Sequence, residues 1–235
     1  MSQPANEAGG AWPGAFGIYK TSRQAVMLNI WPLVFLWLIT FTLIGALSLF
    51  HQKAILALAI VQILSFVIGC IGSVGFTLLL IAGVRGKKLT LDQTFKQIWP
   101  LLLKMIGLTI IVSVALSVSL LLLIVPFFFV LPRLMLADYY LVDKNMGVFE
   151  AFQASWENTK GYSMKVWGII GVNILMALLF VGIIGIPVAI YLLVMYGAAF
   201  AVIYEFISKK QPAVAAGVKP VTVEAKPTAP ATTTK

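Results

Sequence analysis

Cysteine and histidine are almost missing from this chain, with Cys70 and His51 the only members of their types among 235 residues. One cysteine cannot form an internal disulfide, so nothing here uses an oxidising compartment. No second histidine, cysteine or carboxylate lies near His51 in the sequence, so this residue offers neither a zinc site nor a Ser/His catalytic pair. The chain also has no phosphate-binding glycine loop. The sequence therefore predicts a protein that is not an enzyme, without catalytic, cofactor-binding or metal-binding residues.

Charge is also scarce, at 11% of the chain against 60% hydrophobic residues, and the mean hydropathy is +0.99. This composition indicates an integral membrane protein, because ordinary soluble domains are far more polar. Fifteen of the 17 Lys and Arg residues fall at the chain ends or in or just beside two of the connections between apolar runs, the exceptions being Lys53 and Arg133. Since short Lys/Arg-rich loops stay in the cytoplasm, both termini are predicted to be cytoplasmic.

The apolar runs predict six transmembrane helices. About 20 apolar residues cross about 30 Å of hydrocarbon, so the runs 31–50 and 55–84 each fit one helix. The runs 99–142 and 166–207 are too long for one helix and must fold back on themselves. A re-entrant hairpin within 99–142 is the alternative to two full spans there. The turns are predicted at Pro126 and near Pro187, because proline disfavours helix continuation.

Polar tails are predicted to flank this transmembrane domain, which covers 15–207. Residues 1–14 and 208–235 are poor in large apolar groups and are expected to be disordered, the second tail being basic. The net charge of +9 lies in short stretches beside the apolar runs and not in a folded basic face. It therefore predicts attraction to the anionic lipids of the bilayer and no nucleic-acid binding.

Three short amphipathic segments precede the first, third and fifth predicted spans and resemble one another. Two of them begin with T-x-x-Q, at Thr21 and Thr90, which is the form of a helix-capping box; the third begins at Val148. Their apolar stripes suit helices that lie in the headgroup plane, although each could instead be the polar lead-in of its span. The predicted fold is thus all-α, with three parallel repeats of one interfacial helix plus a two-helix hairpin. The predicted interfacial anchors are Trp31, Trp99, Phe95, Phe152 and Trp156.

Arg133 is predicted to lie near the middle of the fourth span. A charge at that depth is costly unless it is paired or faces water, so it is a functional hypothesis by default. Asp138 is its first candidate partner, with Glu205 in the sixth span as another, and the three form a predicted intramembrane polar cluster. Either Arg133 ties helices together, or it lines a path for a substrate or an ion.

Small residues recur every four positions in the second predicted span, at Ser65, Gly69 and Ser73, with Gly72 and Gly75 alongside. Small side chains at this spacing let two helix backbones approach closely. These three residues are therefore predicted to form a helix-packing face, a use that is far commoner than a hydroxyl-lined pore.

The segment from Glu150 to Gly161 reads E-A-x-x-x-S-W-x-x-T-x-G, and it follows Arg133 and the stretch Ala137-Asp-Tyr-Tyr-Leu-Val-Asp143. This region resembles the membrane domain of glycerophosphoryl diester phosphodiesterase and related uncharacterised prokaryotic multi-pass membrane proteins. In those phosphodiesterases catalysis belongs to a separate soluble barrel domain, for which this chain has no room. The resemblance thus implies a membrane fold in the inner membrane of a prokaryote and carries no activity onto these residues.

The function predicted from these observations is that of a non-enzymatic scaffold or accessory partner in the cytoplasmic membrane, acting with a protein partner or as a homo-oligomer. The alternative is a transport or lipid-handling protein with a path past Arg133. Parallel repeats argue against transporters that exchange inverted repeats. The environment of Arg133 separates the two hypotheses: saturation by protein groups favours a scaffold, and a solvated cavity favours transport.

Overall fold

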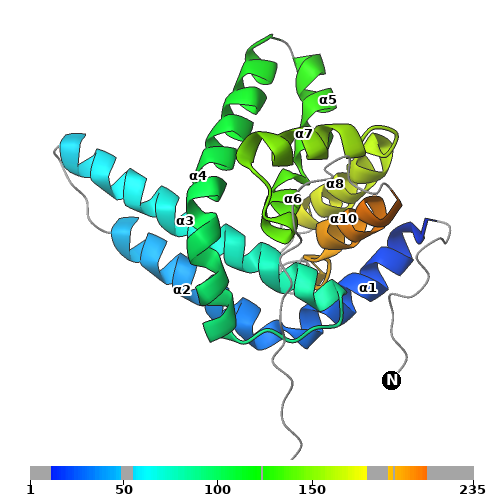
Figure 1. Cartoon of the computed structure of the whole chain (residues 1–235), viewed down its shortest axis with the longest axis horizontal. Helices are drawn as coiled ribbons and strands as arrows, with labels where there is room; N and C mark the ends of the chain where they lie inside the picture. Colours follow the sequence, from blue (N-terminus) through cyan, green and yellow to red (C-terminus); the bar gives the residue numbers. More distant parts are fainter. Residues whose placement is uncertain (1–11, 49–54, 123, 179–189, 193, 211–235) are drawn as a thin grey trace, which may run out of the picture.

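The computed structural model describes residues 12–48, 55–122, 124–178, 190–192 and 194–210, and all regular structure in these ranges is helical. His51, the turn predicted near Pro187 and nearly all of both predicted tails lie outside the described residues. The last helix continues to Lys210, slightly beyond the predicted end of the domain. Figure 1 shows the helices, which are α1 (Gly14–Leu28), α2 (Ile30–Ser48), α3 (Ile55–Val84), α4 (Leu91–Leu122), α5 (Ile124–Leu134), α6 (Ala137–Lys144), α7 (Val148–Asn158), α8 (Ser163–Leu178) and α10 (Ala199–Lys210).

Three of these helices are long and apolar enough to cross a membrane. They are α2, α3 and α4, through the segments Ile30–Leu47, Ala57–Val84 and Leu91–Leu122. The protein buries only 11% of the first segment and 17% of the third, against 44% of the second. So much bare apolar surface would aggregate in water, whereas lipid covers it. The length and composition of the helices therefore identify a membrane-embedded protein.

The fourth predicted span is two short helices instead of one. With 11 and 8 residues, α5 and α6 are about 16 Å and 12 Å long, and neither alone crosses about 30 Å of hydrocarbon. Pro132 weakens the helix shortly before the break. It has no N–H for the carbonyl of Phe128, to which the indole Nε1 of Trp167 donates instead at 3.1 Å, and α5 ends two residues later at Leu134. Pro126 is not itself the corner between α4 and α5: it stands in the first turn of α5, where a missing N–H costs little.

The predicted interfacial segments have three different outcomes. The third is a separate helix, α7, as expected. The first belongs to α1, which already begins at Gly14, so Thr21 lies inside a helix and caps nothing. The second is the opening of α4, which continues through Pro100, and the lead-in alternative is therefore correct there. The Thr90 capping box does form, since Gln93 Oε1 accepts from the Thr90 N–H at 3.2 Å and Thr90 Oγ1 from the Gln93 N–H at 3.4 Å.

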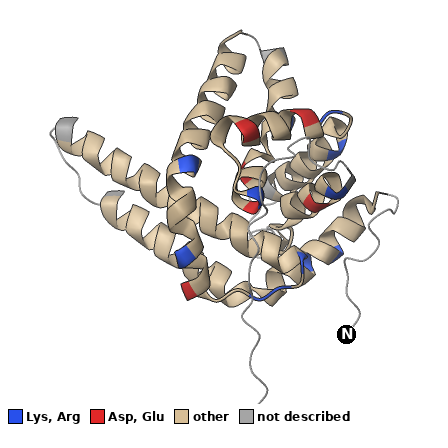
Figure 2. Cartoon of the chain, viewed as in Figure 1, with Lys and Arg blue, Asp and Glu red and all other residues tan. Residues whose placement is uncertain are grey.

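Two apolar hairpins diverge from one polar centre. Figure 1 shows α2 and α3 running together to one side and α4 and α5 running together to the top, with α4 crossing α3. Charged residues lie on α6, α7 and α10, and also on α1 and the lower part of α4, while the described outer turns of both hairpins are free of charge (Figure 2). The charged centre thus anchors two arms whose surfaces suit hydrocarbon.

Close packing around α3 depends on glycines, but not on the three residues that the sequence predicted as the centre of the packing face. A Cβ on Gly69 would meet nothing within 4 Å, and Ser65 and Ser73 are only half-buried. The close approaches are elsewhere: a Cβ on Gly75 would lie 2.6 Å from Leu36 of α2, and one on Gly83 would lie 2.4 Å from the Ala25 carbonyl oxygen of α1. The small residues that bring helices together are therefore Gly72, Gly75 and Gly83.

A pair of glycine substitutions in α3 tests this assignment. Gly83→Ala forces a methyl group onto the backbone of α1 and should destabilise the protein by about 1–3 kcal/mol, the usual cost of overpacking. Gly69→Ala enters open space and should be neutral or stabilising by up to about 1 kcal/mol, because alanine is the better helix former. Unfolding in detergent measures both variants, and equal losses would contradict the assignment.

Candidate functional site

The candidate site is an ionic network centred on Arg85, at the place where three helices meet. Its guanidinium donates from both Nη atoms to the two carboxylate oxygens of Asp143, at 2.5 and 2.7 Å, and its Nε–H donates to Glu205 Oε1. The Tyr204 hydroxyl donates to Asp143 Oδ2 at 2.7 Å. The carboxyl side chains are only 12% and 8% exposed, so they depend on these partners instead of water.

Each member of the network comes from a different part of the chain. Arg85 directly follows α3, Asp143 is the penultimate residue of α6, and Glu205 lies in α10. A cation after the last turn of α3 also meets the partial negative charge of that helix end. Burial alone would lower the pKa of Arg85, but the hydrogen bonds and charges of Asp143 and Glu205 outweigh it and raise that pKa above its usual value. Arg85 therefore remains a fixed cation that joins α3, α6 and α10.

Asn29 reinforces this junction from the other side of α3. It ends α1, is 1% exposed, and donates from Nδ2 to the carbonyl oxygens of Leu79 at 3.2 Å and Lys87 at 3.0 Å. Its Oδ1 accepts from the Leu89 N–H at 3.1 Å. One amide thus fixes the end of α3 and the chain that follows it, which holds Arg85 in place.

A cleft of about 100 Å³ opens beside Arg85. It lies between the end of α3, the first turns of α4 and the end of α6. One wall is apolar and the other carries charged and amide groups. The lining residues include Ile81, Ala82, Leu101, Arg85, Lys87 and Asn145.

Lys104 supports the cleft from α4. Its Nζ donates to the carbonyl and side-chain oxygens of Asn145, at 3.0 and 2.8 Å. Asn145 has a positive φ of 50° directly after α6, a backbone conformation that asparagine tolerates better than most residues. The lysine therefore fixes the turn that forms one side of the cleft.

The predicted cluster of Arg133, Asp138 and Glu205 does not assemble. Glu205 belongs to the Arg85 network. Among the described residues, Arg133 and Asp138 form no ion pair; the Arg133 guanidinium instead lies 4.6 Å from the ring centroid of Trp156. The prediction was wrong because α5 ends at Leu134, one residue after Arg133, so this side chain stands at a helix end facing α7 and not in the middle of a span.

The residues of the E-A-x-x-x-S-W-x-x-T-x-G motif have structural tasks around this break. Glu150 accepts from the Gly147 N–H at 2.9 Å and so caps α7. Ser155 donates its hydroxyl to the Arg133 carbonyl at 2.5 Å, taking the place of a helix partner that the break removes. Thr159 donates to the Ser155 carbonyl at 2.6 Å, and Gly161 takes a φ of +82°, which glycine adopts freely.

The predicted interfacial anchors lie on the surface of the protein or close to it. Trp31 and Trp99 are 76% and 67% exposed, as side chains that enter a headgroup layer would be. Phe95, Phe152 and Trp156 are half-buried. Their depth in a bilayer stays a prediction.

Sequence reasoning missed Arg85 and Asp143 as partners. Arg85 had been counted only as one of the cationic loop residues that set orientation. The available signal was scarcity: the chain has eight acidic residues, and Asp143 and Glu205 are two that stand at the ends of long apolar runs. A carboxylate in that position needs a cation, and Arg85 occupies the matching end of α3.

The described part of the chain contains no group of three or more His, Cys, Asp or Glu side chains that could hold a metal ion. In comparisons with known proteins, no family model matches this chain, and no curated protein or solved structure matches it at a significant level. The family resemblance carried by the motif therefore stays a prediction.

Replacing Arg85 separates the cost of an unpaired charge from the value of the network itself. Arg85→Met leaves Asp143 without a cation and leaves Glu205 with only Lys209, whose Nζ lies 3.6 Å from Glu205 Oε2. The substitution should cost about 3 kcal/mol, the lower end for a broken buried pair, because 35% of the Arg85 side chain is exposed. The triple variant Arg85→Met, Asp143→Asn, Glu205→Gln leaves no stranded charge and should regain most of that loss. Unfolding in detergent compares them; a triple variant no more stable than Arg85→Met would contradict the pairing.

The position of Arg133 predicts a mild phenotype there. Arg133→Leu loses a half-exposed cation–π contact and should cost no more than about 1 kcal/mol. Asp138→Asn should add to it independently, because the two side chains are not paired. Thermal unfolding of both single variants and the double variant measures this; a double variant more stable than Arg133→Leu alone would restore the pairing predicted from the sequence.

Proposed function

We propose that this protein is a non-enzymatic scaffold or accessory partner of the cytoplasmic membrane. The observation that carries the proposal is the Arg85 network: the carboxylates of Asp143 and Glu205, which have little access to water, are neutralised by Arg85 where the helices join. Buried charges that process a substrate need an open site, whereas these hold three chain segments together. Their task is to keep a framework in shape.

The motif residues support the same proposal. Glu150, Ser155, Thr159 and Gly161 cap helices, satisfy a freed carbonyl or form a turn. These are structural roles, and the contacts of these residues hold α7 against α5 and α6. We further propose membership of the multi-pass membrane family that this motif resembles.

Six helices in three parallel repeats, with both termini cytoplasmic in a prokaryotic inner membrane, complete the proposal. Its support is the Lys/Arg distribution together with the network, whose members come from the closing helix of each proposed unit: Arg85 after α3, Asp143 in α6 and Glu205 in α10. The parallel closing ends would then meet at the cytoplasmic side. Anionic lipids, and a protein partner or a second copy of this chain, are the proposed associates.

The transport alternative with a path past Arg133 receives less support. The Arg133 guanidinium stacks on Trp156, its carbonyl accepts from Ser155, and it does not line the cleft beside Arg85. By the criterion of its environment, Arg133 is held by protein groups. A structural role fits these contacts better than a permeation role.

Photo-crosslinking at two positions tests the scaffold proposal in native membranes. A photoreactive phenylalanine analogue at Gln153, exposed on the polar side of α7, should yield protein adducts of defined mass. The same analogue at Leu121, 86% exposed on the apolar end of α4, should react with lipid alone. Equal adducts at both positions would contradict a defined docking face.

The transport alternative is tested in parallel by reconstitution. Vesicles that contain the purified protein and a pH-sensitive dye should pass protons no faster than protein-free vesicles. A proton flux that Arg133→Leu abolishes, in a variant that still folds, would support the alternative and refute the scaffold proposal.

A further inference from the structure

The cleft beside Arg85 is amphipathic in a direction that matches the predicted membrane. Its apolar wall comes from Leu78, Ile81 and Ala82 of α3 and from Pro100 and Leu101 of α4, all within candidate membrane spans. Its polar wall comes from Arg85, Lys87 and Asn145, which lie beyond the end of α3 or after α6. The apolar wall thus lies beside the candidate spans, and the cationic wall lies beyond their ends. This arrangement suits an anionic amphiphile, whose apolar part would contact the first wall and whose charged group the second.

The cationic wall has unused capacity. Arg85 uses three N–H donors on Asp143 and Glu205, whereas a guanidinium carries five, so two are left for another acceptor. Lys87 forms no ion pair within the described part of the chain, while its backbone is fixed by the Ala82 carbonyl and by Asn29. A free ammonium group on an ordered backbone is well placed to bind an anion.

Asp143 also lines the cleft, and its negative charge would repel an anionic ligand unless the protein neutralises it. It accepts two hydrogen bonds from Arg85 and one from Tyr204. Lys144 follows it directly, and Lys104 binds Asn145 at the same rim. The carboxylate is therefore neutralised within the protein, and the groups still available around the cleft are cationic.

We propose that this cleft binds the phosphate group of an anionic phospholipid, with the acyl chains along the apolar wall between α3 and α4. A volume of about 100 Å³ holds several water molecules and so suits a phosphate group, but it excludes a whole lipid, whose chains must lie outside along the exposed helices. The proposal goes beyond the scaffold function and depends only on the protein being embedded in the membrane. The lipid would bridge α3, α4 and α6 and so stabilise the junction.

Native mass spectrometry of the full-length protein in detergent tests the site with two lipids of identical acyl chains. Phosphatidylglycerol should bind in preference to zwitterionic phosphatidylcholine. Lys87→Gln should weaken phosphatidylglycerol binding about fivefold, which corresponds to about 1 kcal/mol per basic residue near a lipid surface. It should leave phosphatidylcholine binding unchanged, and the fold should persist because Lys87 contributes only its backbone to the junction.

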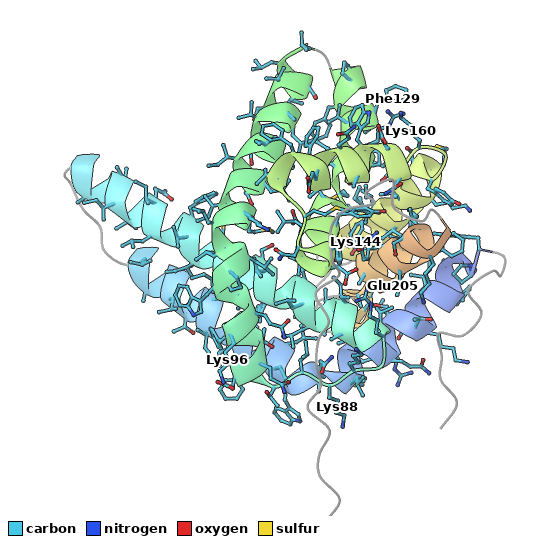
Figure 3. The ribbon with its side chains drawn as sticks, viewed as in Figure 1. Lys88, Lys96, Phe129, Lys144, Lys160 and Glu205 are labelled. Carbon is cyan, nitrogen blue, oxygen red and sulfur yellow. The ribbon has the colours of Figure 1, made fainter. Side chains whose placement is uncertain are left out.

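Lys96→Gln is the matched control. It removes the same charge from a side chain that is 75% exposed and paired with Asp92, near the start of α4 and apart from Lys144 and Glu205 (Figure 3). The control should bind phosphatidylglycerol like the wild type. If both substitutions weaken phosphatidylglycerol binding equally, the effect comes from general surface charge and the proposal is overturned. Competition by inorganic phosphate at equal concentration would identify a free-phosphate site and overturn it as well.

Discussion

The guanidinium of Arg85 is the group on which the rest of the structure depends. Two carboxylates with almost no access to water accept hydrogen bonds from it, and each arrives on a different helix. If the arginine were missing, the two acids would repel each other at the meeting point of α3, α6 and α10. A bidentate fork to Asp143 with a third bond to Glu205 also fixes direction, which a lysine at this position could not do.

That junction matters more in a membrane than it would in water. Lipid covers apolar helices as well as another helix does, so association depends on close backbone contact and polar ties. Gly75 and Gly83 supply the contact, letting α3 approach α2 and α1, and Arg85 and Asn29 supply the ties. The hairpins can therefore diverge, as Figure 1 shows, because they are held at their bases instead of along their lengths.

The sequence predicted what depends on composition and local pattern, including the membrane class, the limits of α3 and the start of α7. It did not predict which face of a helix packs against its neighbours, because the tertiary structure decides that. Ser65, Gly69 and Ser73 have the spacing of a helix-packing face, but only the positions of α1 and α2 decide which small residues of α3 make close contact. Arg133 was placed in mid-span because the fourth span was predicted as one continuous helix, whereas α5 ends at Leu134. Arg85 lies 58 and 120 residues from its partners, a separation that no local pattern reveals.

The coupling energy between Arg85 and Asp143 tests the account most directly. It can be measured in detergent by a double-mutant cycle of Arg85→Ala, Asp143→Ala and the double variant, with the exposed pair Lys96 and Asp92 as the reference. A bidentate, largely buried pair should couple by at least about 1.5 kcal/mol, against about 0.5 kcal/mol for the reference pair. Additivity of the Arg85 and Asp143 effects to within about 0.5 kcal/mol would contradict the account.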